Sequence, residues 1–241
     1  MNRIEVELFL SGEPVLAWSR YLCWAEMLYA RFARFAKGDP DMKNVKNTWR
    51  AFALFSQWLA SLYVLVEGWE HLGVTDAGLD KLLSGQAAPG YRDLLRRYRN
   101  AVFHYKPRLA EVRFAEFVRE GPEVALWAMR LHRQFVRFLW EWLELQDMRL
   151  GWSRGAKDTR RAVRSLIGWV PPDRPRARTP FRRVLRARVA LDHVTKALEL
   201  AGYAWADGKP LPPQELGKSR PNQGMHGAAQ KKRAAGDAPS R

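Results

Sequence analysis

Apolar side chains recur every three or four residues through most of the chain, and this spacing predicts helices. The first predicted helix has Ser11 or Gly12 as its N-terminal cap and Pro14 in its first turn, and it stops at Gly38 and Pro40. Its apolar positions are Leu16, Tyr21, Trp24, Leu28, Phe32 and Phe35.

The same period predicts helices over residues 45–72, 76–83, 90–105 and 122–149, with one or two helical turns at 112–118. Pro107 disfavours helix at the preceding residue and so ends the helix over 90–105. No alternating run with a hairpin turn is evident. The pattern therefore predicts an all-α fold in which residues 1–150 form an antiparallel helical bundle.

The pattern changes after the predicted bundle. Residues 151–206 contain the proline- and arginine-rich stretch WVPPDRPRARTP, which predicts a linker, followed by a basic amphipathic helix over 181–200 that Thr179 and Pro180 begin. Residues 207–241 have almost no large apolar side chains, so we predict that this tail is disordered.

The composition indicates a sizeable hydrophobic core and an anionic partner. The chain has 241 residues, of which 47% are apolar, and a formal net charge of +16. The net charge is only +3 over residues 1–150 but +9 over 151–206 and +4 over 207–241. Such an excess indicates nucleic acid as a partner, although solubility alone also explains it. The basic segment either holds phosphates or is a solvated or docking arm.

Cysteine use and hydropathy bear on the compartment. The single cysteine, Cys23, excludes an internal disulfide and fits a reducing, cytoplasmic environment. The N-terminus lacks the apolar run of a secretory signal. Residues 51–69 are apolar enough to raise the question of a membrane span, but Gln57 and Glu67 interrupt them. We therefore expect a core helix and no membrane partner.

The stretch RRYRNAVFHYKP is the main candidate for chemistry. On a helix its apolar residues cluster on one side, which is predicted to enter the bundle: Leu94, Leu95, Tyr98, Ala101, Val102 and Tyr105. Its polar residues and one aromatic residue lie on the other side: Arg96, Arg97, Arg99, Asn100, Phe103 and His104. Asn100 and His104 are neighbours because they are four residues apart.

These residue types suit metal-independent cleavage of RNA. A histidine transfers protons near neutral pH, and a guanidinium stabilises charge on a phosphate. An alternative is a solvated basic face with a histidine at its end. An outward Phe103 indicates contact with a second subunit or a stacked base, unless a neighbouring helix or the connection after Pro107 covers it.

The stretch RNAVFH, Arg99 to His104, resembles the R-x4-H signature of the HEPN superfamily of helical ribonucleases. An Asn follows the Arg in many members, as Asn100 does here, and Tyr105 stands where many have an aromatic residue after the His. The resemblance covers roughly residues 10–150. It implies a metal-independent homodimer that cuts RNA by attack of the 2′-hydroxyl and leaves a cyclic phosphate, often as a toxin or in defence against phage.

The resemblance also implies roles for single residues. Arg99 would stabilise the scissile phosphate, His104 would transfer protons, and Asn100 would position them. Two sets of flanking residues would then bind substrate or form the dimer seam: Arg96 and Arg97, and Phe103 and Tyr105. An antitoxin or regulatory protein is a further partner to expect, and no cofactor is implied.

A few other residues give weaker signals. Glu67 either orients Arg99 or His104 as a carboxylate partner or lies at the solvent edge and pairs with His71. His132 has arginines nearby in sequence and is predicted to lie at the surface. No cluster with metal-ligand spacing and no phosphate-binding glycine loop occurs, so we expect no metal. The alternative function is a non-catalytic helical module that binds nucleic acid or protein.

Overall fold

A computed structural model of the chain describes residues 3–38, 44–84, 89–105, 112–149, 157–170, 180–206 and 209–211. These residues form eight helices and two short strands: α1 (Arg3–Gly38), α2 (Val45–Leu72), α3 (Ala77–Leu83), α4 (Tyr91–Phe103), α5 (Val112–Arg119), α6 (Pro122–Arg149), α7 (Lys157–Ile167), α8 (Pro180–Leu200), β1 (Ala204–Ala206) and β2 (Lys209–Leu211). The all-α prediction is confirmed for the described residues apart from the two strands. The predicted disordered tail lies almost entirely outside them.

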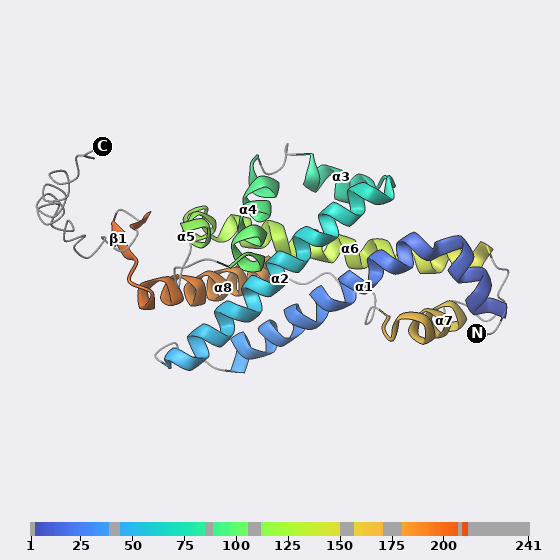
Figure 1. The fold of residues 1–241 in the computed structure, drawn as a ribbon, viewed down its shortest axis with the longest axis horizontal. Coiled ribbons are helices and arrows are strands. Elements are labelled where there is room, and N and C mark those ends of the chain that lie inside the picture. The colour runs from blue at the N-terminus through green and yellow to red at the C-terminus, as the bar shows by residue number, and fades with distance from the viewer. Residues whose placement is uncertain are drawn as a thin grey trace, which may run out of the picture.

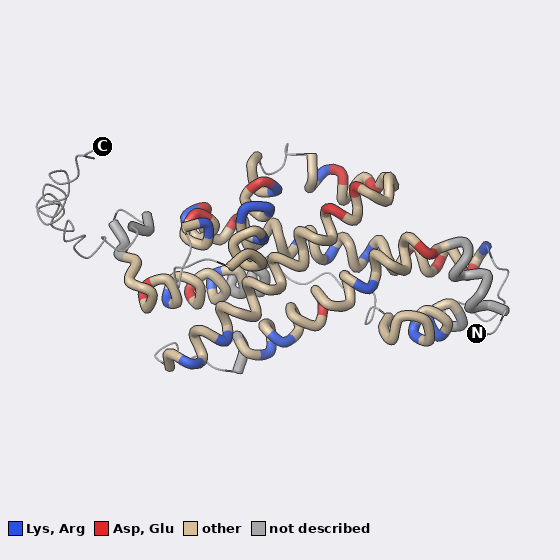
Figure 2. Tube along the Cα trace, viewed as in Figure 1, with Lys and Arg blue, Asp and Glu red and all other residues tan. Residues whose placement is uncertain are grey.

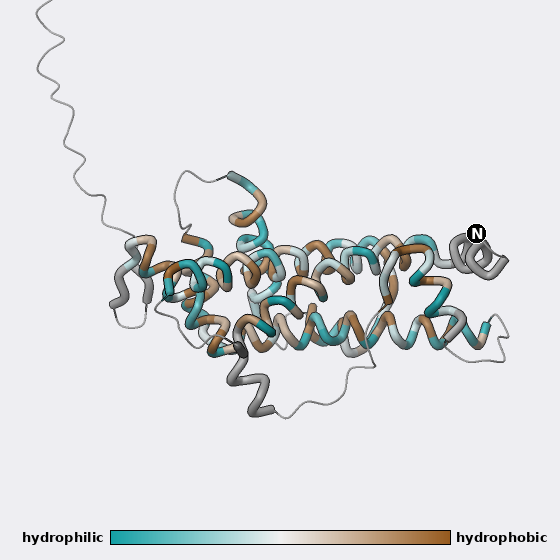
Figure 3. Tube along the Cα trace, turned by 90° about the horizontal axis from the view of Figure 1, so that it is seen from below, coloured by the Kyte–Doolittle hydropathy of each residue, from teal (hydrophilic) through white to brown (hydrophobic). Residues whose placement is uncertain are grey.

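Three long helices, α1, α2 and α6, make the framework (Figure 1). α1 and α2 run in opposite directions and pack along each other, while α4 and α8 pack on α2. α6 packs against α3, α7 and α8, and α7 also lies along α1. Hydrophobic and hydrophilic residues alternate along these helices (Figure 3), as amphipathic helices in a shared core require.

The centre of the core is rich in aromatic rings. Trp18 of α1 lies against Trp69 of α2 and against Phe135 and Phe138 of α6, with ring centroids 5.4–6.2 Å apart. Its indole N–H donates to the main-chain oxygen of Leu65 at 3.1 Å. Buried indoles need such an acceptor, so this bond fixes the ring against α2.

Gly68 makes this approach possible. A Cβ added at Gly68 would lie 2.8 Å from Cδ1 of Trp18. That distance is a steric overlap with a ring that is 3% exposed and already held by its hydrogen bond. α1 and α2 therefore meet closely because α2 has no side chain at this position.

The apolar run of α2 is largely accounted for by packing. By length and composition alone α2 is able to cross a membrane, and more than half of its most apolar window is buried inside the protein. Trp58, Leu59 and Leu62 are among its fully buried residues. The helix begins at an Asn44 side-chain cap and ends at Gly73, whose φ is 61°, in agreement with the predicted bounds.

The boundaries of α1 differ from the prediction. The helix begins at Arg3 rather than at a cap on Ser11 or Gly12, and Pro14 lies inside it. A proline removes one main-chain hydrogen bond, but the turns after it bury Val15, which is 9% exposed, and Leu16, which is 3% exposed. The predicted end at Gly38 is confirmed.

One helix and a pair of short strands were not predicted. α7 buries Ala162 and Val163, and its Thr159 bonds to the Asp147 carboxylate of α6. β1 and β2 pair antiparallel, with Ala204 opposite Leu211. Strands of three residues are too short to show an alternating pattern, although the intervening Asp-Gly sequence is typical of hairpin turns.

Candidate functional site

The stretch that resembles the HEPN signature lies in the second half of α4. Leu94, Leu95, Tyr98 and Ala101 are buried, as the helical projection predicts. The Tyr98 hydroxyl is 2.8 Å from the Ser56 hydroxyl of α2, and burial raises the pKa of Tyr98. This buried bond fixes the rotation of α4 on α2, so the opposite face of α4 is turned outward.

α4 ends earlier than predicted. Phe103 is its last residue, and His104 is the C-terminal cap, with φ −108° and ψ 130°. The prediction that Tyr105 enters the core is wrong, because Tyr105 lies beyond the helix and is 92% exposed. Phe103 and His104 are also exposed, so no buried contact after Val102 extends the helix. His104 remains tied to the motif because its main-chain N–H donates to Asn100 O at 3.3 Å.

Arg99 is held on two sides. Its Nη1 donates to Oδ1 of Asn100 at 2.9 Å, and its Nη2 donates to Oε2 of Glu67 at 3.4 Å. The Arg99 side chain is 28% exposed and that of Glu67 44%. Nε of Arg99 is buried and has no hydrogen-bond partner within the described residues. The structure thus brings Arg99, Asn100 and Glu67 together, with the Arg99 side chain partly exposed.

Of the two interpretations of Glu67, the geometry fits a carboxylate that orients Arg99. The residues are 32 apart in sequence and lie on different helices. The imidazole of His104 is exposed, and in the described part of the chain it makes no hydrogen bond or ion pair. The catalytic pair implied by the resemblance is therefore linked through Asn100, by a side-chain bond to Arg99 and a main-chain bond to His104.

The remaining arginines of α4 are also paired. Arg96 contacts Asp93 at 2.6 Å, Arg97 contacts Asp93 at 3.3 Å and Glu116 of α5 at 2.9 Å, and Arg92 contacts Glu70 of α2. These three arginines and Arg99 are matched by an equal number of carboxylates. Positive and negative residues accordingly lie side by side around α4 (Figure 2). Any phosphate bound here competes with carboxylates for these guanidinium groups.

The prediction that His132 lies at the surface is wrong. The side chain is buried between α1, α2 and α6, where Nδ1 accepts from Nε1 of Trp58 at 3.1 Å. Nε2 lies 2.6 Å from Oε2 of Glu26. Because Nδ1 is an acceptor, the ring proton resides on Nε2 and donates to Glu26. Position 132 has helical spacing to the buried positions 125, 128, 135 and 139, which indicates burial. The prediction instead relied on the arginines that neighbour it in sequence.

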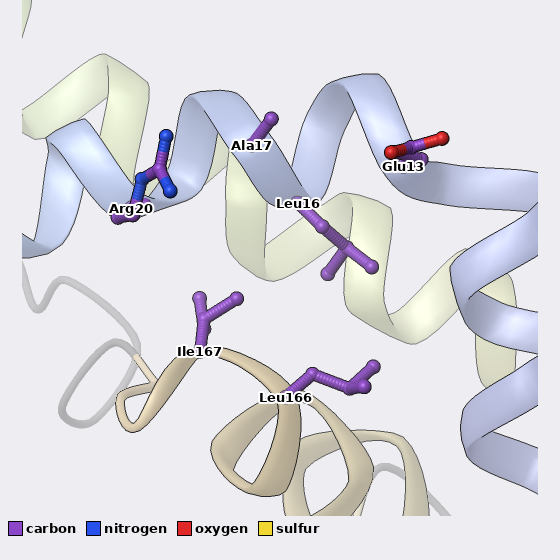
Figure 4. Close-up of a pocket in the computed structure, with 6 residues that line it drawn as sticks. All are labelled: Glu13, Leu16, Ala17, Arg20, Leu166 and Ile167. Atoms are coloured by element: carbon purple, nitrogen blue, oxygen red, sulfur yellow. The ribbon is translucent and has the colours of Figure 1, made fainter. Parts of the chain in front are cut away.

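A cavity of about 230 Å³ lies elsewhere, between α1 and α7 (Figure 4). Its walls are mainly apolar: Leu16, Ala17, Leu166 and Ile167, with Glu13 and Arg20 at its two ends. It is smaller than the roughly 300–1,000 Å³ of ordinary small-molecule sites. Within the residues that the structure describes, no three His, Cys, Asp or Glu side chains gather as a metal site would require.

No protein-family model, curated protein or solved structure matches this chain. Any assignment of function consequently depends on the chemistry of the Arg99 site itself.

Proposed function

We propose that the chain is a metal-independent endoribonuclease of the HEPN type. The observation that carries the proposal is the bond of Arg99 to Asn100 on the outward face of α4, directly before the exposed His104. An exposed imidazole and a guanidinium that are linked through one amide residue supply the two kinds of group that RNA cleavage needs.

The reaction follows from these groups. The 2′-oxygen of the RNA attacks the adjacent phosphorus, its proton passes to a base, and the P–O5′ bond breaks. The products are a 2′,3′-cyclic phosphate and a 5′-hydroxyl that has received a proton. His104 transfers a proton in this sequence, and Arg99 stabilises the charge on the phosphorane. Asn100 keeps the guanidinium in place by its 2.9 Å bond.

The contacts of Arg99 in the free chain are compatible with binding a phosphate. The bond of Arg99 to Asn100 is 0.5 Å shorter than its contact with Glu67, which is 3.4 Å long and partly exposed. Exposed ion pairs of this kind contribute only about 0–1 kcal/mol. A phosphate therefore replaces Glu67 at Nη2 while Asn100 keeps its hold on Nη1.

The finer parts of the proposal concern assembly. Residues 1–150 form the HEPN-like bundle, and two chains place their α4 faces against each other. Phe103, which is 48% exposed, and Tyr105, which is 92% exposed, supply apolar surface for that contact. The proposal extends to a cytoplasmic toxin or defence role with RNA as substrate and a regulatory protein as partner.

A second candidate function has one specific observation in its favour. Every arginine of α4 is paired with a carboxylate, which reduces the attraction of this face for a polyanion. A non-catalytic helical module that binds nucleic acid elsewhere on its surface fits that balance. Absence of cleavage by a folded wild-type chain would favour this alternative.

The test compares RNA cleavage by the wild type, Arg99→Ala and His104→Ala in the presence of EDTA. We expect both substitutions to lower the rate about 10²- to 10⁴-fold, and the wild-type products to carry cyclic phosphate by mass spectrometry.

The matched control is His71→Ala, an exposed histidine at the end of α2. Its neighbour Glu70 pairs with Arg92, which lies about 18 Å from His104 along α4 at 1.5 Å per residue. Wild-type rates are expected for this control. Equal cleavage by His104→Ala and wild type would contradict the proposal.

A further inference from the structure

We propose that the outward face of α1 binds single-stranded nucleic acid, at a site separate from the α4 motif. Five side chains form the site, which we term the α1 stripe: Arg20, Trp24, Met27, Arg31 and Arg34. Their spacing of four, three, four and three residues places them along one line of the helix. All five are exposed, Trp24 by 50% and Met27 by 57%.

The aromatic part of the stripe is held in place and still accessible. The Arg20 guanidinium lies 5.5 Å from the centre of the Tyr21 ring and 5.8 Å from that of Trp24. Tyr21 meets Trp24 edge to face, with centroids 5.2 Å apart. These contacts restrict the indole but leave half of its surface in solvent. An exposed ring beside a guanidinium is a stacking surface for a nucleobase.

The charge of the stripe is not balanced by the carboxylates that the structure describes. Among the residues that the structure describes, no carboxylate forms an ion pair with Arg20, Arg31 or Arg34. Glu26 is the one acidic residue in the sequence between positions 14 and 34, and its carboxylate is bonded to buried His132. Glu13 lies at the opposite end of the cavity from Arg20 (Figure 4).

Two further positive residues lie near the Arg34 end of the stripe (Figure 1). Lys46 and Arg50, also exposed, lie at the start of α2, beside the end of α1 that carries Arg34. Figure 2 shows positive residues along this end of the helix pair with very few negative ones. From Arg20 to Arg34 the stripe is about 21 Å long, at 1.5 Å per residue, which is enough for several phosphates of one strand.

These features favour single-stranded nucleic acid over other anionic surfaces. A helix that lies on a membrane needs a broad apolar face, whereas the stripe has two apolar side chains between arginines. A duplex keeps its base faces stacked, so only an unpaired strand offers both phosphates to the arginines and a base to Trp24. α1 and α4 pack on α2 rather than on each other, so the stripe is distinct from the Arg99 site.

The test measures binding of the full chain to a fluorescent 20-nucleotide DNA strand, which lacks the 2′-hydroxyl and is not cleaved. The first variant is the triple substitution of Arg20, Arg31 and Arg34 by Gln. The control removes the same charge from three exposed arginines of α5 and α6: Arg119, Arg130 and Arg149, each replaced by Gln. Affinity is measured over a range of salt concentrations.

We expect the α1 triple variant to bind more weakly and to reduce the slope of log K against log salt by about 2, at roughly 0.7 per lost phosphate contact. The control triple variant should keep the wild-type slope. Trp24→Ala should weaken binding roughly 5- to 150-fold, and Trp24→Phe should retain most of the affinity, because a ring still stacks. The same changes in affinity should be seen with a single-stranded RNA when the variants also carry His104→Ala, which prevents cleavage.

Several outcomes would overturn the inference. Equal slopes for the two triple variants would show that α1 makes no phosphate contacts. If Trp24→Ala dissociates a dimer in sedimentation experiments and leaves oligonucleotide binding unchanged, the stripe is an interface between copies. Binding to anionic lipid vesicles but not to oligonucleotide would assign it to a membrane. Because the DNA strand is not cleaved, loss of the proposed nuclease activity would leave this result intact.

Discussion

The outward faces of α4 and α1 both carry arginines and exposed aromatic residues, but they differ in how the arginines are satisfied. On α4 each arginine pairs with a carboxylate. Three of these carboxylates belong to α2 and α5. On α1 the nearest acidic residue in sequence, Glu26, is turned inward to His132. The comparison shows that the presence of basic residues alone does not identify an anion-binding surface. The carboxylates within reach decide whether a guanidinium attracts a polyanion or is already neutralised.

The two faces suggest a division of work in which α1 contributes affinity and α4 contributes chemistry. In the proposed reaction Arg99 benefits from a partner that fixes its geometry, as Asn100 does through its bond to Nη1. A binding surface benefits from unpaired charge, which raises affinity and association rate.

The largest expected effect separates the two faces directly. His104→Ala should lower the single-turnover cleavage rate about 10²- to 10⁴-fold and leave single-stranded DNA binding unchanged. The triple substitution of Arg20, Arg31 and Arg34 by Gln should weaken binding and leave the rate at saturating RNA unchanged. If both variants lose both properties in proportion, the division between the faces is wrong.

The next effect tests what holds α1 in place. His132→Ala removes the acceptor of the buried Trp58 N–H and the donor to Glu26. We expect the free energy of unfolding to fall by about 2–4 kcal/mol, since each unsatisfied buried group costs about 1–3 kcal/mol. Urea denaturation measures the loss, and exposed His71→Ala serves as the control. Wild-type stability in His132→Ala would mean that these bonds contribute nothing net.

The partly buried ion pair of Asp76 and Arg137 should contribute more to stability than the exposed ion pairs of α4. Asp76 caps α3 and pairs with Arg137 of α6. Burial alone would raise its pKa, but the hydrogen bonds from Arg137 and the Leu79 N–H outweigh it and hold the pKa below the ordinary value. Asp76→Asn should cost about 1–2 kcal/mol at neutral pH.

The pH dependence of Asp76→Asn follows from the direction of that shift. A lowered native pKa stabilises the fold above the unfolded pKa of about 3.9, and this stability is lost as pH falls through the native value. The difference between wild type and Asp76→Asn should therefore shrink as pH drops below about 4. A difference that stays constant to lower pH would contradict the shift.

The smallest effect concerns Glu67. Glu67→Gln keeps an acceptor for Arg99 and removes the negative charge that competes with phosphate. We expect KM for RNA to fall by no more than about fivefold with kcat unchanged, since exposed pairs contribute about 0–1 kcal/mol. Glu70→Gln, which releases Arg92 instead, is the matched control. A large loss of kcat would show that the Glu67 carboxylate takes part in proton transfer.

The helices that the sequence predicts well are those with clear ends. α2 has Asn44 and Gly73 at its caps, and α6 starts at Pro122, so period and end signals agree. α7 was not predicted, although Ala162, Val163, Leu166 and Ile167 recur at helical spacing. The bond that holds its start, from Thr159 to Asp147 twelve residues earlier on α6, is not visible in that local pattern.

The candidate site shows the same limit. Helical spacing places Arg99, Asn100 and His104 on an outward face, but it does not show that Glu67 of α2 is the residue that reaches Arg99. His132 was misplaced because three arginines near it in sequence lie on other faces of α6. Burial of a polar side chain depends on partners from other helices, here Trp58 and Glu26, and one helix projection does not contain them.

Gly68 gives a means of finding relatives. It directly follows Glu67, so consecutive positions of α2 serve the Arg99 contact on one side and the closely packed Trp18 on the other. A chain that preserves both contacts has to keep Glu or another side-chain acceptor, followed by glycine, in its second long helix, about thirty residues before the Arg-Asn pair. Joined to the later histidine, that dipeptide makes a longer and more selective signature than the six-residue motif alone.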